Sequence, residues 1–292
     1  MLREFRYRID SDHRSIKEFL LKMEYSKNCL SFLKQNDGVF LNGSPAKMTE
    51  SLKSGDELRI VFDEHESNDL VVDTDIPVDI VYEDEDIIIV NKQAGLPVHP
   101  SYFNYTHNLA NALSYYYHNR KENYINRCIT RLDGDTSGLV LLARNLYSCA
   151  ILQKRLRQHR IYKEYTAIAE GNFETESGII NEPIARISSD TMERCVREDG
   201  QPSVTEYHVI KQIPGYSLLR IITHTGRTHQ IRVHMAYIGH PLIGDWLYNP
   251  NSKVVPRQAL HVSLLRFEHP VTKEELTFTC ELPDEIRIEG LI

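Results

Sequence analysis

Apolar residues recur at helical spacing near the start of the chain and alternate with polar residues over much of the rest. Between residues 12 and 34 the helical period is interrupted near residue 26, so we expect two short helices there. Strand-and-turn patterns follow at 38–43 and 54–61. Residues 12–61 therefore predict a compact α+β module.

Strand patterns dominate after residue 78. Two apolar runs, 78–82 and 87–90, flank an acidic turn and predict a hairpin. Further strands are predicted at 139–143, 162–170, 204–211, 216–223, 258–267 and 274–280, and helices near 109–116 and 146–156. These patterns predict an α+β fold built on a largely antiparallel, bent β-sheet with flanking helices.

Acidic and polar residues separate the two sets of patterns. Residues 64–77 have the composition of a linker. We therefore predict a small module over residues 1–63, an acidic linker over 64–77 and a larger domain over 78–292. A chain of 292 residues is long enough to bury the core of an enzyme in the larger part.

The net charge of −7 is unevenly distributed along the chain. Residues 1–62 contain 11 Lys/Arg and 9 Asp/Glu, a net of +2, which leaves −9 for the remainder. Any contact with a nucleic acid must therefore be local. One basic cluster, at Lys154, Arg155, Arg157 and Arg160, is a candidate RNA contact, although a solvated helix face explains it equally well.

The apolar runs are too short to cross a bilayer, and the first residues lack the apolar core of a signal peptide. We therefore expect a cytoplasmic protein with no membrane partner. The five cysteines are dispersed without a CxxC pair, which favours reduced thiols over a disulfide framework or a zinc site.

A glycine-rich polar loop precedes the buried strand predicted at 139–143. Its residues 130–138 include Asp133 and Asp135 between small and polar neighbours. A carboxylate in a tight loop at the edge of the core suits a catalytic acid. The competing interpretation is that either aspartate caps the loop by accepting backbone N–H bonds.

A second unusual segment, residues 224–234, contains three histidines and two arginines. The histidines are five residues apart, which places neighbours on different faces of either a helix or a strand. This spacing argues against a metal site, and we expect none. Arg227 and Arg232 are candidate partners for a carboxylate or a phosphate, with an ordinary ion pair as the alternative.

A third segment, residues 161–171, predicts a strand on which Tyr165, Ala167 and Ala169 share one face. Small residues beside an aromatic ring leave room for a flat ligand. The alternative is that Tyr165 is an ordinary core residue whose hydroxyl is hydrogen-bonded.

Together these segments resemble the RluA-type family of pseudouridine synthases from about residue 78 to residue 282. The matching motifs occur in the family's order: NKQAGLPVHP at 91–100, RLDGDTSGL at 131–139, KEY at 163–165, TGRTHQIRVH at 225–234, GHPLIGD at 239–245 and ALH at 259–261. Thr130 stands where the family usually has His, and Gln93 where it usually has Pro. Residues 12–61 resemble, less closely, the αL RNA-binding module that often precedes this domain.

The resemblance implies that a uridine in RNA loses its C1′–N1 bond, turns, and is rejoined through C5. Asp133 would start the reaction, by attacking the sugar or by promoting proton removal from it. Arg232 would favour the ionised carboxylate, and Tyr165 would stack on the base and serve as a candidate general base. No cofactor is expected, because an isomerisation needs no cosubstrate.

The same resemblance assigns Arg131 to the space that the extruded base vacates, with the basic cluster and Arg227 contacting RNA. We expect a monomer that acts on ribosomal or transfer RNA. One alternative is a non-catalytic RNA-binding protein or RNA chaperone on the same fold. A second is a hydrolase that uses Asp133 and Asp135 as paired carboxylates.

Overall fold

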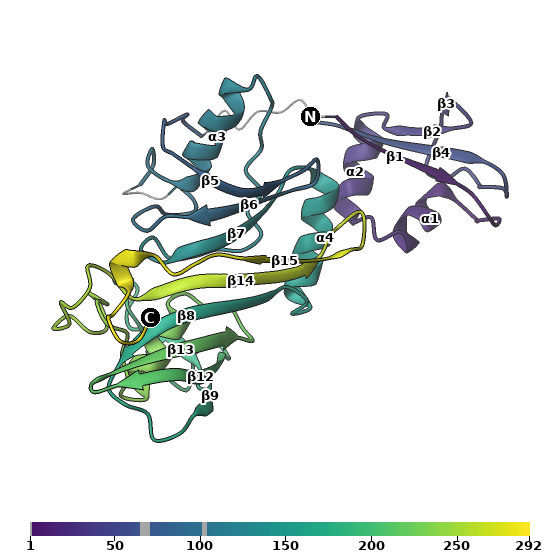
Figure 1. Ribbon diagram of the computed structural model, residues 1–292. Helices are drawn as coiled ribbons and strands as arrows, with labels where there is room; N and C mark the ends of the chain where they lie inside the picture. The colour runs from purple at the N-terminus through teal and green to yellow at the C-terminus, as the bar shows by residue number, and fades with distance from the viewer. Residues whose placement is uncertain (1, 65–70, 101–103) are drawn as a thin grey trace.

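The computed structural model describes residues 2–64, 71–100 and 104–292 and begins with a small four-stranded sheet. The sheet has the order β1-β4-β2-β3 and consists of β1 (Leu2–Arg8), β2 (Val39–Leu41), β3 (Ser44–Pro45) and β4 (Glu57–Asp63). Figure 1 shows this sheet with its two helices at one end of the molecule. Residue 1 and residues 65–70 and 101–103 lie outside the description.

The two short helices expected near the N-terminus are confirmed as α1 (Ile16–Lys22) and α2 (Lys27–Gln35). Each begins at a serine, Ser15 or Ser26, whose hydroxyl accepts a backbone N–H from the first turn. Strand β1 was not predicted from the sequence. Its alternation is weak, because Phe5 is the one buried residue in it.

A nine-stranded sheet forms the rest of the molecule, and all but one of its strand pairs are antiparallel. Its order is β5-β6-β7-β14-β8-β13-β12-β9, with β15 paired to β14. The strands are β5 (Asp79–Glu83), β6 (Ile87–Lys92), β7 (Ser137–Ala143), β8 (Tyr162–Glu170), β9 (Ser177–Asn181), β12 (Val204–Ile213), β13 (Tyr216–Thr223), β14 (Leu260–Glu268) and β15 (Glu275–Thr279). The predicted α+β class and largely antiparallel sheet are confirmed, and so is the hairpin of β5 and β6.

The parallel pair, β7 with β14, joins the two halves of this sheet. At the crossing Gly138 has φ +111° and faces Val262, and a Cβ on it would lie 2.4 Å from the Val262 carbonyl oxygen. Only glycine allows so close an approach in this conformation. The loop that contains Asp133 therefore enters β7 at the centre of the sheet.

Three further helices pack against the sheet: α3 (Leu109–Asn119), α4 (Leu146–Arg157) and α5 (Gln230–Tyr237). Helix α4 lies between the large sheet and the N-terminal part (Figure 1). Cys149 and Leu152 pack into the core of the large sheet, whereas Tyr147 and Ile151 pack into the N-terminal core. Among the described residues, no helix is long and apolar enough to span a bilayer.

Charged groups also link the N-terminal part to the large sheet. Arg3 donates from Nε and Nη2 to the two carboxylate oxygens of Asp86, at 3.1 and 2.7 Å. Glu64, at the start of the predicted linker, is 4% exposed and pairs with Arg127. Residues 65–70 of that linker lie outside the described residues, and the division into domains stays a prediction.

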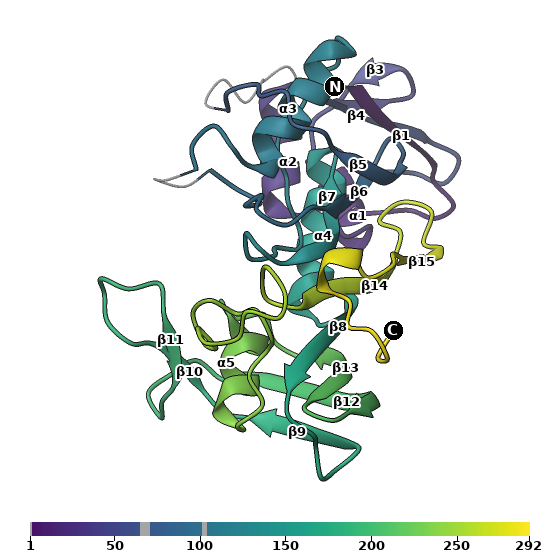
Figure 2. The ribbon, with the colours of Figure 1, turned by 60° about the vertical axis from the view of Figure 1, so that its left-hand side comes forward.

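Besides β1, four short strands and one α-helix were missed from the sequence. They are β3, β9, β10 (Ile184–Arg186), β11 (Arg194–Val196) and α5. Figure 2 shows β10 and β11 as a separate ribbon beside α5. Helix α5 is buried on nearly every side, so it carries no amphipathic stripe from which a helix could be recognised.

Candidate active site

The loop before β7 is tied to the sheet by its backbone and by one threonine. Thr130 Oγ1 accepts the N–H of Leu141 at 2.9 Å, and the N–H groups of Ile129 and Thr130 donate to the carbonyl oxygen of the same leucine. Asp133 accepts the N–H of Thr136 with its backbone oxygen, at 3.1 Å. The main-chain oxygen of Asp133, rather than its carboxylate, therefore caps the loop. The Asp133 side chain is 26% exposed.

Lys92 holds the other side of this loop. Its buried ammonium donates to the carbonyl oxygens of Gln93, Leu96 and Gly134 at 2.8–2.9 Å. Burial lowers the pKa of Lys92 to about 7, yet only the protonated amine has three donors for these three acceptors. The Gln93 departure from the family pattern is accommodated because its backbone oxygen makes this contact and its side chain is exposed.

Arg232 approaches the Asp133 carboxylate from α5. Its Nε and Nη2 both donate to Asp245, each at 2.7 Å, and its Nη1 lies 3.3 Å from Asp133 Oδ2. Burial lowers the pKa of Arg232, but the hydrogen bonds and charge of Asp245, with Asp133, outweigh that effect and raise the pKa above its usual value. The guanidinium is therefore a permanent cation whose orientation is set by one aspartate and whose remaining donor faces the other.

His229 also lies beside Asp133, and sequence reasoning missed it as a site residue. Its Nε2 is 4.0 Å from Asp133 Oδ2, and it has a left-handed backbone with φ +58° immediately before α5. The three histidines of this segment were considered together only as metal ligands. Their five-residue spacing was a signal in the sequence, because it places the three histidines on different faces, where each can contact a different partner.

The structure gives the three histidines separate partners. His224 Nε2 lies 2.9 Å from Glu206, His229 Nδ1 lies 3.0 Å from the Tyr248 hydroxyl, and His234 is buried with its ring between Thr205 and the carbonyl oxygen of Glu182. Their side chains therefore do not converge on a common point.

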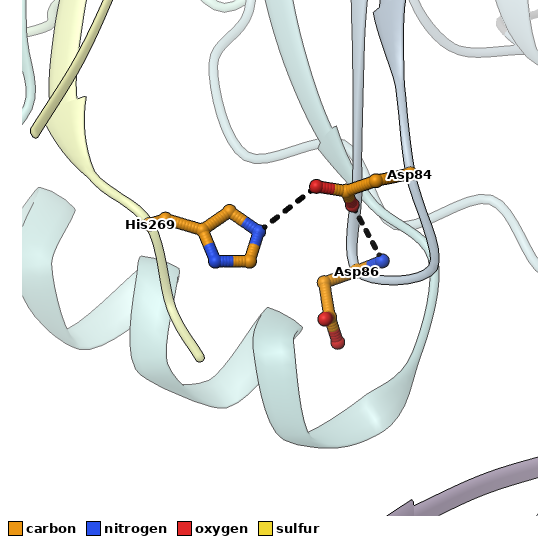
Figure 3. A group of neighbouring side chains, drawn as sticks. All are labelled: Asp84, Asp86 and His269. Atoms are coloured by element: carbon orange, nitrogen blue, oxygen red, sulfur yellow. Dashed lines mark hydrogen bonds and ion pairs between the residues drawn. The ribbon is translucent and has the colours of Figure 1, made fainter. Parts of the chain in front are cut away.

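A different cluster, Asp84, Asp86 and His269, brings potential metal-ligand atoms within 4.8 Å of one another (Figure 3). Asp86 is already engaged by Arg3 and by the side chains of Asn145 and Ser148, each within 3.1 Å. Burial raises the pKa of Asp84, but hydrogen bonds from His269 and two backbone N–H groups hold it at about 2. We interpret this cluster as the junction between the N-terminal part and the large sheet.

Tyr165 lies on β8, between Val262 of β14 and Ile221 of β13. Its side chain is 7% exposed, and its hydroxyl lies 3.5 Å from Lys163 Nζ. It shares a buried face with Ala167 and Ala169, as expected. The expected room beside the two alanines is absent from the described structure, because both pack into the core and do not line the cleft.

A cleft of about 610 Å³ brings the principal candidates together. That volume is within the range of small-ligand pockets. Its lining includes residues from the loop before β7, from α4, from β8 and from the start of α5, namely Arg131, Asp133, Arg157, Tyr165, Arg227, His229 and Arg232. Arg131, Arg157 and Arg227 are exposed at this cleft.

The basic cluster of α4 is not brought to the cleft as a unit. Lys154 pairs with Glu24 at 2.7 Å, and Arg160 lies 3.5 Å from Glu268. Arg155 is 3% exposed and bonded to Glu268, so it is unavailable to RNA in this structure, and we do not retain it as an RNA contact. Of the four basic residues, Arg157 is the one that lines the cleft.

Comparison with known proteins agrees with this geometry. A sequence profile described as RNA pseudouridylate synthase matches residues 86–237. The chain belongs to the RluA-type RNA pseudouridine synthases. The synthase is thus an isomerase, and the matched region contains the Asp133 loop, β8 and α5.

Individual relatives match most of the chain. The synthase is 34% identical to "Uncharacterized RNA pseudouridine synthase YjbO" of Bacillus subtilis, over 93% of this chain and 96% of the relative. It is 37% identical to "Ribosomal large subunit pseudouridine synthase D" of Haemophilus ducreyi, over 89% and 84% of the two chains. The structure of "Human RNA Pseudouridylate Synthase Domain Containing 1" is similar with a TM-score of 0.59 and 26% identity, covering 70% of this chain and 83% of that one.

Asp245→Asn tests whether the Arg232 orientation matters for turnover. The asparagine amide presents an N–H group in place of one carboxylate oxygen. It therefore cannot accept from both Nε and Nη2, and we expect the guanidinium to turn so that Nη1 no longer points at Asp133. A misplacement of about 1 Å near the reacting atoms can cost on the order of 100-fold in rate. We expect kcat to fall by about that factor, with a smaller change in KM, in an assay of pseudouridine formation.

The matched control is Asp199→Asn, because Asp199 is an exposed partner of Arg197 away from the cleft. Thermal unfolding of both variants separates lost orientation from lost folding, since breaking a buried pair costs about 3–5 kcal/mol. An Asp245→Asn enzyme that is folded and has an unchanged kcat would contradict this role for the Arg232 orientation.

Proposed function

We propose that the synthase converts selected uridines of RNA to pseudouridine with Asp133 as its essential carboxylate. The observation that supports this most directly is the asymmetric setting of that carboxylate. Arg232 Nη1 and His229 Nε2 both face Oδ2, at 3.3 and 4.0 Å. Within the described residues Oδ1 accepts no hydrogen bond, so we propose that Oδ1 reacts.

The proposed reaction conserves every atom of the nucleotide except for exchange of hydrogen. The C1′–N1 bond breaks, the uracil turns, and a C1′–C5 bond forms while the C5 hydrogen leaves and N1 gains a proton. Asp133 acts on the sugar, either as a nucleophile at C1′ or by promoting proton removal. Tyr165, at the cleft wall on β8, is proposed to stack against the uracil and to assist the proton transfer.

We propose that a target uridine is turned out of its stack before it reaches Asp133, at a cost of a few kcal/mol. Arg131 is exposed, lines the cleft and lies two residues before Asp133. A planar guanidinium at this position can stack in the space that the extruded base vacates. This supports the base-replacing role predicted from the family resemblance.

Arg157 and Arg227 are proposed to contact phosphates at the rim of the cleft. Both are exposed cleft residues. Arg227 Nε donates to the carbonyl oxygen of Pro202, and its two other guanidinium nitrogens form no hydrogen bond with the described residues. The N-terminal part, with its net charge of +2 over residues 1–62, is proposed as a further RNA contact.

The relatives favour ribosomal over transfer RNA as the first substrate to test. Several of them carry the name ribosomal large subunit pseudouridine synthase D, at 35–39% identity. We therefore propose large-subunit ribosomal RNA as the substrate. The non-catalytic alternative is disfavoured because Asp133, Arg232 and Tyr165 are all present at one cleft.

Asp133→Asn tests the proposed carboxylate. Loss of its charge should lower the rate by at least about 10³-fold, the scale seen when a group that reacts directly is removed. The reaction is followed by release of tritium from C5 of uridine in large-subunit ribosomal RNA, and by mapping pseudouridines in RNA from cells that carry either form. Retained pseudouridine formation by the variant would exclude Asp133 as the essential group.

Asp135→Asn is the matched control, because its carboxylate contacts the Trp246 ring nitrogen at 3.3 Å rather than lining the cleft. We expect this variant to keep its activity. A loss equal to that of Asp133→Asn, together with release of free uracil, would instead support the hydrolase that uses both carboxylates.

Arg157→Gln tests the proposed phosphate contact. Each phosphate contact contributes about −0.7 to −0.9 to the slope of log affinity against log salt. We expect weaker RNA binding and a slope reduced by about that amount, measured by filter binding between roughly 50 and 200 mM salt. Lys211→Gln, on the exposed far part of β12, serves as the control, and equal slopes for the two variants would contradict the contact.

A further inference from the structure

Tyr248 links its own loop to β11 and to the start of α5 through one hydroxyl. It lies on the loop that follows α5, and its hydroxyl oxygen is 2.9 Å from the backbone nitrogen of Arg194 in β11. The same oxygen is 3.0 Å from Nδ1 of His229. β11 lies beside α5 (Figure 2), so the hydroxyl bridges this strand to the residue that precedes the helix.

The directions of these two hydrogen bonds follow from the donors available. A backbone N–H can only donate, so the Tyr248 oxygen accepts from Arg194. The hydroxyl has one hydrogen of its own, and in the arrangement we infer it donates this hydrogen to His229 Nδ1. A neutral imidazole that accepts at Nδ1 carries its proton on Nε2.

The proton placed in this way faces the reacting carboxylate. His229 Nε2 lies 4.0 Å from Asp133 Oδ2. Burial lowers the pKa of His229; the charges of Arg232 and Arg194 act in the same direction, while those of Asp133 and Asp245 oppose it. The ring is thus neutral near pH 7 and offers a single N–H to the cleft.

Tyr248 also contacts the second group that faces Asp133. The guanidinium carbon of Arg232 lies 5.1 Å from the centre of the Tyr248 ring, within the range of a cation–π contact. The backbone N–H of Tyr248 donates to Asp245, at 3.1 Å, and Asp245 orients Arg232. One residue therefore touches both His229 and Arg232.

We propose that Tyr248 is a positioning residue of the synthase: its hydroxyl fixes His229 as the Nε2–H tautomer, so that this N–H and the Arg232 Nη1–H both address Oδ2 of Asp133. The inference rests on the proposed role of Asp133. His229 Nε2 lies 4.0 Å and Arg232 Nη1 3.3 Å from Oδ2, an arrangement that leaves Oδ1 free to react. Tyr248 itself is not among the residues that line the cleft.

Tyr248→Phe isolates the hydroxyl, because the ring beneath Arg232 is kept. Nitrogen-15 NMR of the His229 ring reads the tautomer directly. In the wild type at pH 7 we expect a protonated Nε2 and an unprotonated Nδ1; in Tyr248→Phe we expect a mixture of tautomers and a higher His229 pKa, since the hydrogen bond that favours the neutral form is lost. We expect kcat to fall by about 10-fold, the effect of one hydrogen bond, with KM nearly unchanged.

A double-mutant cycle tests whether Tyr248 acts through His229. If it does, adding Tyr248→Phe to His229→Phe causes no further loss of kcat. His229→Gln, whose amide N–H can occupy the position of Nε2–H, should recover part of the activity lost in His229→Phe. Tyr237→Phe, at an exposed tyrosine of α5, is the control and should behave as wild type, and thermal unfolding is measured for every variant.

Two results would overturn the proposal: a wild-type His229 protonated on Nδ1, or a folded Tyr248→Phe enzyme with wild-type kcat. If Asp133→Asn is inactive while Tyr248→Phe is fully active, the positioning role fails and the role of Asp133 stands. If Asp133→Asn retains activity, the proposed function of that carboxylate fails, and the positioning role fails with it.

Discussion

The proposed active site depends on one guanidinium that is shared between two aspartates. Arg232 gives two donors to the fully buried Asp245 and one to the partly exposed Asp133. A buried cation with a single partner would be free to adopt several orientations, whereas the bidentate pair leaves one. The Asp133 carboxylate therefore meets a positive charge at a defined position in the cleft, at the cost of burying an ion pair that stability alone would not favour.

The rest of the fold holds the two sides of this contact in place. The Asp133 loop is tied to β7 through Thr130 and to the 92–96 segment through the Lys92 ammonium. Gly138 allows β7 to meet β14, which in turn pairs with β8 and so brings Tyr165 to the same cleft. Groups from distant parts of the chain thus converge on the sheet centre, which is a rigid support suited to chemistry that depends on orientation.

Motif order and local pattern predicted a large part of this arrangement. The two N-terminal helices, the β5–β6 hairpin and α4 follow from apolar periodicity. The meeting of Asp133, Tyr165 and Arg232 at one cleft was expected from the family resemblance, since their spacing alone left capping, ion-pair and core alternatives open.

Contacts between residues far apart in the chain were beyond the reach of the sequence. Arg155 is buried, and its guanidinium donates a hydrogen bond to Glu268, which lies 113 residues away in the chain. The basic cluster that resembled an RNA-binding surface is therefore divided among separate ion pairs. His229 was considered only as a metal ligand, because its neighbours Tyr248 and Asp133 are brought to it by the tertiary fold. The α5 helix was missed for the related reason that nearly all of it is buried.

The most direct test of the central claim is a structure of the synthase bound to an RNA whose target uridine carries fluorine in place of the C5 hydrogen, so that the last proton loss from C5 cannot occur. We predict that the target nucleotide lies outside its stack in the cleft, with C1′ within about 3–3.5 Å of Asp133 Oδ1 and with Arg232 still at Oδ2. A ribose bound away from Asp133, or a carboxylate turned back to the loop backbone with the nucleotide in place, would contradict the account.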